Sequence, residues 1–300
     1  MEPAAPRLRD RVEVLLGAAF WCVAGASAAL CGAADVFAPY ALPVAAAACA
    51  WPIVRRRRWA VDVLDWLPFP FVVLTYGMLH ALVPACWAAT IDPWLAEADR
   101  ALLGEHAGVL LEPLVSPALT TLMAAFYASY YVLPVSLAAW WWRRDRRAFR
   151  ELMVGEVGAL FVGYLGYLYL PAIGPHAHLP AATFGTALEG DFIGAVIRGL
   201  NEVHGGVFPR DAFPSLHTAN AVTIVLVALR RERRVLWVYG PAVAGLIAAT
   251  VYLRFHYVVD VVAGAALAVV WQRAAVGLVA RESDWTPGGL QSTAGSRRAA

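Results

Sequence analysis

The 300-residue chain contains no lysine, and charged residues of any kind make up only 15% of it. Hydrophobic residues account for 60%, and the mean hydropathy is +0.59. A composition this apolar excludes an ordinary soluble domain and is typical of a protein that crosses the membrane several times. Only four cysteines are present, all within or at the ends of apolar runs, and no pair has metal-ligand spacing.

Apolar stretches of about 20 residues, the length needed to cross a bilayer as a helix, recur along the chain. They predict an all-α fold, a polytopic membrane helical bundle of about eight transmembrane helices. The second and sixth stretches are the shortest, so either could form a tilted or a partly re-entrant helix. The stretches are 12–33, 38–54, 66–88, 118–142, 152–172, 214–229, 235–253 and 257–276.

All 24 basic residues are arginines, and most lie in the terminal segments or in runs at every second loop. The positive-inside rule makes those loops cytoplasmic, so both termini are expected in the cytoplasm. Binding of anionic lipid headgroups is the alternative explanation of the runs. A net charge of +2 organised in this way predicts a membrane protein without a nucleic-acid partner. The arginines left for the outer side are Arg100, Arg198, Arg210 and Arg254.

Three regions are expected along the chain. Residues 1–60 hold two amino-terminal membrane helices, residues 61–281 hold a six-helix membrane-embedded core, and residues 282–300, rich in Gly, Ser and Thr, form a disordered tail. The outer segment 89–117 mixes apolar and charged residues, and we expect it to lie flat at the interface.

Two short clusters near the carboxy terminus contain the residues best suited to chemistry. Residues 213–217 read Phe-Pro-Ser-Leu-His and residues 254–260 read Arg-Phe-His-Tyr-Val-Val-Asp. The hairpin between them has two legs of similar length, which places His217 and His256 at the same outer face. His256 and Asp260 are four residues apart, so on a helix the carboxylate orients the imidazole as a nucleophile. His217 is then free to protonate a leaving alkoxide.

Phosphate is the substrate group that these surroundings suit. Arg210 and Arg254 supply permanent charge and forked donors for phosphate oxygens. Ser215, at the start of a predicted span, adds a hydroxyl beside the unpaired amides of a helix amino terminus. This scheme needs neither a metal nor a cofactor.

Other roles for the histidines stay open at this point. Paired histidines on neighbouring helices could be axial haem ligands, which would leave Asp260 and the arginines without a task. A non-catalytic lipid-binding or transport protein on the same helices is a further alternative. His176 and His178 could line the site or bind an opportunistic metal, whereas His80, His106 and His204 receive no role.

The two clusters resemble motifs of the type 2 phosphatidic acid phosphatase superfamily, Pro-Ser-x-His at 214–217 and His-x-x-x-Asp at 256–260. Residues 212–217 read Ala-Phe-Pro-Ser-Leu-His, and residues 250–253 read Thr-Val-Tyr-Leu. Both segments are similar to the branch that contains inositol phosphorylceramide synthase. The resemblance implies that His256 takes up the phosphoryl group, that Asp260 orients it, and that His217 is the general acid and later the base. It implies a lipid phosphate or phospholipid substrate, and water or a lipid alcohol as acceptor. The distribution of arginines predicts that the site faces the extracytoplasmic side.

The sequence departs from the family pattern in its first motif. The family begins that motif with a basic residue, usually lysine, and ends it with Arg-Pro, whereas this chain contains no lysine and no Arg-Pro pair. The phosphatases also place an arginine where this chain has Thr250, and the synthase branch is similar in lacking it. Arg210 and Arg254 are therefore the candidates for the missing positive charge.

Overall fold

The computed structural model describes residues 11–54, 59–188 and 209–284, and in these ranges the regular elements are all helical. The α-helices are α1 (Val12–Leu30), α2 (Ala34–Val54), α3 (Ala60–Trp66), α4 (Pro68–Cys86), α5 (Asp92–Leu103), α6 (Ala107–Leu110), α7 (Pro117–Ala128), α8 (Leu133–Arg144), α9 (Arg146–Tyr169), α10 (Pro175–His178), α12 (Leu216–Arg231), α13 (Leu236–Tyr252) and α14 (Val258–Asp284). Single 3-10 turns are η2 (Glu112–Leu114), η3 (Ser129–Tyr131), η4 (Ala181–Thr183) and η5 (Arg233–Val235).

Six of the described helices are long and apolar enough to cross a membrane: α1, α2, α4, α9, α13 together with η5, and α14. Helices α7 and α8, bent by 44° about η3, pass the same test as a pair. Helix α12 has 16 residues and is shorter than a typical span. The predicted all-helical, multi-pass membrane bundle is confirmed. The bent pair decides between six and seven spans, and the shortness of α12 is the reason that length does not support the eighth predicted span.

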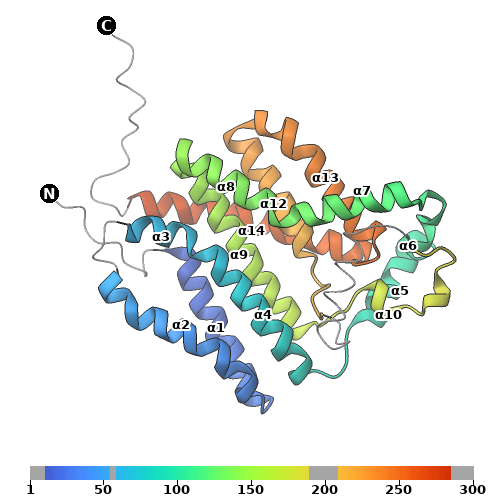
Figure 1. Cartoon of the computed structure of the whole chain (residues 1–300), viewed down its shortest axis with the longest axis horizontal. Helices are drawn as coiled ribbons and strands as arrows, with labels where there is room; N and C mark the ends of the chain where they lie inside the picture. The colour runs from blue at the N-terminus through green and yellow to red at the C-terminus, as the bar shows by residue number, and fades with distance from the viewer. Residues whose placement is uncertain (1–10, 55–58, 189–208, 285–300) are drawn as a thin grey trace, which may run out of the picture.

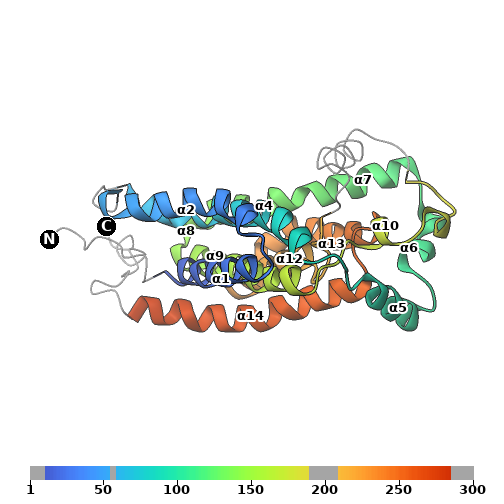
Figure 2. The same ribbon diagram turned by 90° about the horizontal axis from the view of Figure 1, so that it is seen from below.

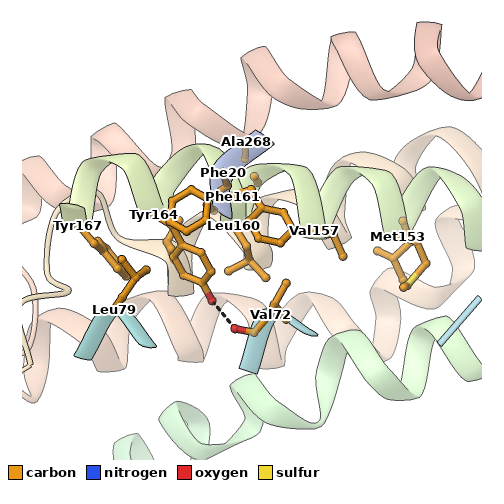
Figure 3. Close-up of a cluster of buried hydrophobic side chains, with 14 of the residues drawn as sticks. Phe20, Val72, Leu79, Met153, Val157, Leu160, Phe161, Tyr164, Tyr167 and Ala268 are labelled. Carbon is orange, nitrogen blue, oxygen red and sulfur yellow. Dashed lines mark hydrogen bonds between the residues drawn. The ribbon is translucent and has the colours of Figure 1, made fainter. Parts of the chain in front are cut away.

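Helix α9 forms the centre of the bundle, packed against α1, α4, α8, α12 and α14. Most of its side chains are buried, and Figure 3 shows part of the resulting hydrophobic core. The Tyr164 hydroxyl in this core donates a hydrogen bond of 3.2 Å to the backbone oxygen of Val72 on α4. Such a bond satisfies a polar group that lipid could not. Helix α9 therefore provides the rigid frame against which the helices of the site are placed.

The start of α1 and the end of α14 lie at one end of the bundle, and α5, α6 and α10 lie at the other (Figures 1 and 2). The arginines near the first end also make ion pairs with buried acids. Arg150 contacts both carboxylate oxygens of Glu13 at 2.6 and 2.9 Å, and Arg231 contacts Glu151 at 2.7 Å. These arginines therefore join helices to one another. The predicted domain boundaries stay predictions, and residues 285–300 of the expected tail lie outside the described ranges.

Candidate active site

The two sequence clusters meet at the end of the bundle that carries α5, α6 and α10. His217 lies in the first turn of α12, and His256 lies in the turn between α13 and α14. The Nε2 atom of His256 is 3.3 Å from Nδ1 of His217, and the two rings meet edge to face. The predicted pairing of the two histidines at one face of the bundle is thus present in the structure.

Hydrogen-bond partners fix which nitrogen of His256 carries a proton. Its Nδ1 lies 2.9 Å from the backbone oxygen of Ala212, an atom that only accepts hydrogen bonds. Nδ1 must therefore be protonated, which leaves a lone pair on Nε2 in the neutral ring. The contact at Nε2 is then a hydrogen bond donated by the Nδ1–H of His217. The geometry gives one nitrogen suited to attack and a neighbouring N–H suited to proton transfer.

Asp260 lies close to His256 but differs from the expected arrangement. His256 precedes α14, which starts at Val258, so the two residues are not stacked on a regular helix. The Oδ2 atom of Asp260 is 3.5 Å from His256 Nδ1 and accepts a 2.9 Å bond from the backbone N–H of Tyr257. The direct orienting acceptor of His256 is therefore a backbone carbonyl, and the carboxylate of Asp260 adds negative charge nearby.

Close packing of α12 and α14 brings the two clusters into register. A Cβ atom on Gly264 of α14 would overlap the backbone oxygen of Ser215, so only glycine allows this approach. The backbone N–H of Ser215 also donates to the backbone oxygen of Asp260 at 3.1 Å. The start of α12 is thus tied directly to the first turn of α14.

Two buried aspartates on α5 hold the segment around His256, and the sequence analysis did not identify them. Asp99 accepts hydrogen bonds of 2.9 Å from the backbone N–H groups of Val258 and Val259, the first residues of α14. Asp92 accepts bonds of 2.8 Å from the N–H groups of Ile173 and Gly174. The available signal was their spacing of seven residues, which puts both carboxylates on the inner face of a short amphipathic helix.

Asp92 also accepts a hydrogen bond from the Tyr257 hydroxyl at 3.2 Å, next to His256 in the chain. Gly174 has a φ of +82°, and a Cβ there would overlap the backbone oxygen of Phe255. Residues 171–175, which connect α9 to α10, therefore pack directly on the segment that carries His256.

A small cavity opens beside His256 and is lined by Arg254, His106, Asp99 and Phe184, among others. Arg254 is buried, and its φ of +64° lies in the left-handed region that is uncommon for a residue with a side chain. Its guanidinium donates to the backbone oxygen of Thr186 at 2.8 Å and lies 3.9 Å from the centre of the Phe184 ring.

Burial lowers the pKa of Arg254 from its ordinary value, while Glu112, 3.6 Å away, opposes the shift. A guanidinium stays protonated under these conditions. The Nε atom of Arg254 is buried and has no hydrogen-bond partner among the described residues. The structure thus places one charged donor with spare capacity in the cavity that His256 lines.

Arg210 and Ser215 do not line this cavity. The guanidinium of Arg210 donates to the backbone oxygen of Trp87 at the end of α4. Ser215 is fully buried and caps α12, its hydroxyl accepting a 3.3 Å bond from the N–H of Thr218. Their predicted contacts with phosphate stay predictions, and in this structure both side chains hold the ends of helices.

Aromatic side chains surround His217 on its other faces. Tyr127 stacks on the imidazole with a centroid separation of 4.6 Å, and Tyr130 lies at 4.3 Å. On α4, the Tyr76 hydroxyl donates a 2.6 Å bond to Asp211, which follows Arg210 in the chain. The sequence analysis gave these tyrosines no role, because nothing in their spacing relates them to His217.

His176 is close to the site but packs as part of its frame. Its backbone N–H donates to the backbone oxygen of Arg254 at 2.8 Å, and its ring packs edge-on against Phe255. Burial lowers the pKa of the His176 imidazole to about 4, so the ring is neutral at physiological pH. Among the described residues, no three His, Cys, Asp or Glu side chains are grouped so that they could hold a metal ion.

Comparison with known proteins gives one match. The model of a protein family described as the PAP2 superfamily matches residues 93–274, more than half of the chain. The matched segment runs from α5 through most of α14 and contains both histidines, Asp260 and the cavity residues. No curated protein and no solved structure gives a match.

Proposed function

The chain belongs to the PAP2 superfamily, and from this premise we propose that it cleaves or transfers a phosphoester of a membrane lipid through a phosphohistidine on His256. The observation that carries the proposal is the 3.3 Å contact between Nε2 of His256 and Nδ1 of His217, beside a cavity that is lined by Arg254. A nucleophile, a proton donor and a phosphate-binding cation are then all present within one site.

In the first step, Nε2 of His256 attacks phosphorus and the bond from phosphorus to the leaving oxygen breaks. His217, in its imidazolium form once the phosphate is bound, donates one proton to that oxygen and becomes neutral, so that the lipid leaves as an alcohol. In the second step, His217 takes a proton from the acceptor hydroxyl, which attacks phosphorus and breaks the P–N bond. His256 is then restored with its Nδ1 proton still bonded to Ala212.

The surrounding charges stabilise the charge that develops in each step. Attack by Nε2 makes the imidazole of His256 positive, and the carboxylate of Asp260 3.5 Å from Nδ1 favours that charge. The guanidinium of Arg254 donates to the phosphate oxygens through Nε, which has no hydrogen-bond partner among the described residues.

Water as acceptor makes the protein a lipid phosphatase, and a lipid alcohol makes it a phosphotransferase. The motif resemblance to the inositol phosphorylceramide synthase branch favours the phosphotransferase. The distribution of arginines between loops favours a site that faces the extracytoplasmic side with both termini in the cytoplasm.

The experiment offers purified protein a panel of phospholipids and isoprenoid phosphates, with and without lipid alcohols, and follows free phosphate and new lipid products. His256→Gln is expected to abolish both, whereas His178→Gln, a histidine on α10 outside the cavity lining, is expected to retain activity. Acid-labile phosphate trapped on wild-type protein and absent from His256→Gln supports the intermediate. Absence of any product and of trapped phosphate contradicts the proposal.

A bis-histidine haem site is the competing function. A haem iron would have to stand between the two imidazoles, and nitrogens within 3.3 Å of each other leave no room for it. A Soret band in purified wild-type protein that is lost in His256→Ala would favour haem binding over the proposed catalysis. A non-catalytic lipid carrier predicts instead that His256→Ala still binds lipid and that wild-type protein shows no turnover.

A further inference from the structure

A carboxylate lies in the middle of the membrane bundle, away from the candidate active site. Glu156, halfway along α9, is 1% exposed. Neither of its oxygens has a hydrogen-bond partner within the described parts of the chain. An ionisable group at this depth is costly and marks a functional site by default.

Three other buried side chains near Glu156 also present oxygens without hydrogen bonds from the described residues. These atoms are Asn220 Oδ1, Thr223 Oγ1 and Gln272 Oε1. Together with the carboxylate they form a group of acceptor atoms contributed by α9, α12 and α14, three helices that pack against one another.

The packing of Gly155 and Tyr130 locates this group. The Gln272 side-chain oxygen and the Thr223 methyl group both lie against Gly155, the residue before Glu156. Asn220 precedes Thr223 by one helical turn on α12 and donates a 3.4 Å bond to the Tyr130 hydroxyl. Tyr130 in turn lies within electrostatic range of Glu156. These contacts place the four side chains along the same stretch of the interface between α9, α12 and α14.

The chemistry of this region favours a cation. Burying an ionised carboxylate without a partner is expensive, and the nearest acid on the same helix, Glu151, is already paired with Arg231. Hard cations are bound by carboxylate, amide and hydroxyl oxygens, and five such oxygens lack a partner among the described residues here, beside one amide nitrogen, Nε2 of Gln272. One carboxylate balances one positive charge, so a monovalent ion fits and a divalent ion leaves an excess charge in the core.

We propose that Glu156, Asn220, Thr223 and Gln272 bind a single Na⁺ ion within the bundle. Bound Na⁺ joins α9 to α12 and α14, the two helices whose outer ends carry His217 and Asp260. The proposal is independent of the reaction at His256, because it concerns the stability of the helices beneath the site.

The test measures the midpoint unfolding temperature of detergent-purified protein while NaCl replaces choline chloride at constant ionic strength. The wild-type midpoint is expected to rise with NaCl to a plateau, because a ligand that binds only the folded state stabilises it. Glu156→Gln is expected to lose this dependence. Glu97→Gln, the same change at an exposed position of α5, is expected to keep it.

Thr223→Val keeps the shape of the side chain and removes one ligand, so about tenfold more NaCl is expected for the half-maximal effect. Binding of ²²Na⁺ to the wild type, one ion per chain and displaced by NaCl but not by choline chloride, supports the site directly. A wild-type midpoint that responds to pH but not to NaCl shows that Glu156 holds a proton, and overturns the proposal. An unaltered NaCl dependence in Glu156→Gln also overturns it.

Discussion

The Nε2 atom of His256 lies 3.3 Å from Nδ1 of His217, although 39 residues separate them in the chain. In the resting site each nitrogen is the hydrogen-bond partner of the other. A phosphoryl group can reach Nε2 only by replacing this hydrogen bond, so the rings must separate when substrate enters. The contact therefore keeps the nucleophilic nitrogen oriented until substrate arrives.

Replacing His217 by Gln should slow turnover of alkyl phosphoesters by about 10²- to 10⁴-fold, because the leaving alkoxide loses its acid. With an aryl phosphate whose leaving group needs no proton, formation of the phosphohistidine should proceed at close to the wild-type rate and the intermediate should accumulate. Rapid-quench measurements with both substrates check this. An equal loss with both leaving groups contradicts the acid role.

Arg254→Ala should lower kcat/KM by about 10²- to 10³-fold, the range expected for loss of a charged donor to the transferred group. Arg210→Ala is the matched comparison, because Arg210 donates to Trp87 rather than lining the cavity. We expect Arg210→Ala to change kcat/KM by only a few fold. Similar losses in the two variants would support the phosphate contact predicted for Arg210 from the sequence.

Asp99→Asn should destabilise the protein by about 1–2 kcal/mol, since the carboxylate caps the start of α14 through two N–H groups. The amide can accept only through its oxygen and carries no charge. The midpoint unfolding temperature measures the effect, and Glu97→Gln on the exposed face of α5 is the control. Equal midpoints for Asp99→Asn and wild type would show that the cap contributes nothing.

His176 should make the protein acid-sensitive, because burial lowers its pKa from 6.5 to about 4 in the folded state. As the pH falls from about 6.5 to 4, the unfolded chain takes up a proton that the folded chain does not, so the free energy of unfolding decreases. The decrease reaches about 3 kcal/mol for this group. Among its titratable neighbours, Asp211 and Asp92 favour the proton, and a protonated His256 opposes it.

The change that tests this acid sensitivity is His176→Gln. Its midpoint unfolding temperature should fall less steeply between pH 7 and pH 4.5 than that of wild type. His178→Gln, two residues along α10, should retain the wild-type slope. Parallel pH curves for wild type and His176→Gln would show that another group is responsible.

Much of the fold could be predicted from hydrophobic length alone, because lipid forces each apolar stretch to satisfy its backbone within a helix. Each of the eight predicted stretches contains helix. The bend between α7 and α8 was not predicted, since residues 118–142 form one continuous apolar pattern. It places Tyr127 and Tyr130 against His217, a tertiary contact that periodicity does not encode.

The placement of His217 and His256 could be predicted because two hairpin legs of similar length return the chain to one depth. The orientation of His256 could not, because the acceptor of its Nδ1 is the backbone of Ala212, and a backbone oxygen has no sequence signature. Which of Arg254 and Arg210 lines the cavity could not be predicted either. Both were equivalent candidates by position, and only the packing around Gly108 and Phe184 distinguishes the one that lines the cavity.

Asp92 and Asp99 hold two different segments from one short helix, and this restricts how α5 can change in evolution. Seven residues make nearly two whole turns, so the two carboxylates point the same way. Inserting or deleting one residue between them would rotate Asp99 by about 100° relative to Asp92, and only one of the two could keep its backbone partners. The exposed positions of α5, such as Trp94 and Glu97, are free to vary. Homologues that retain this architecture should therefore differ in α5 by substitution and not by length.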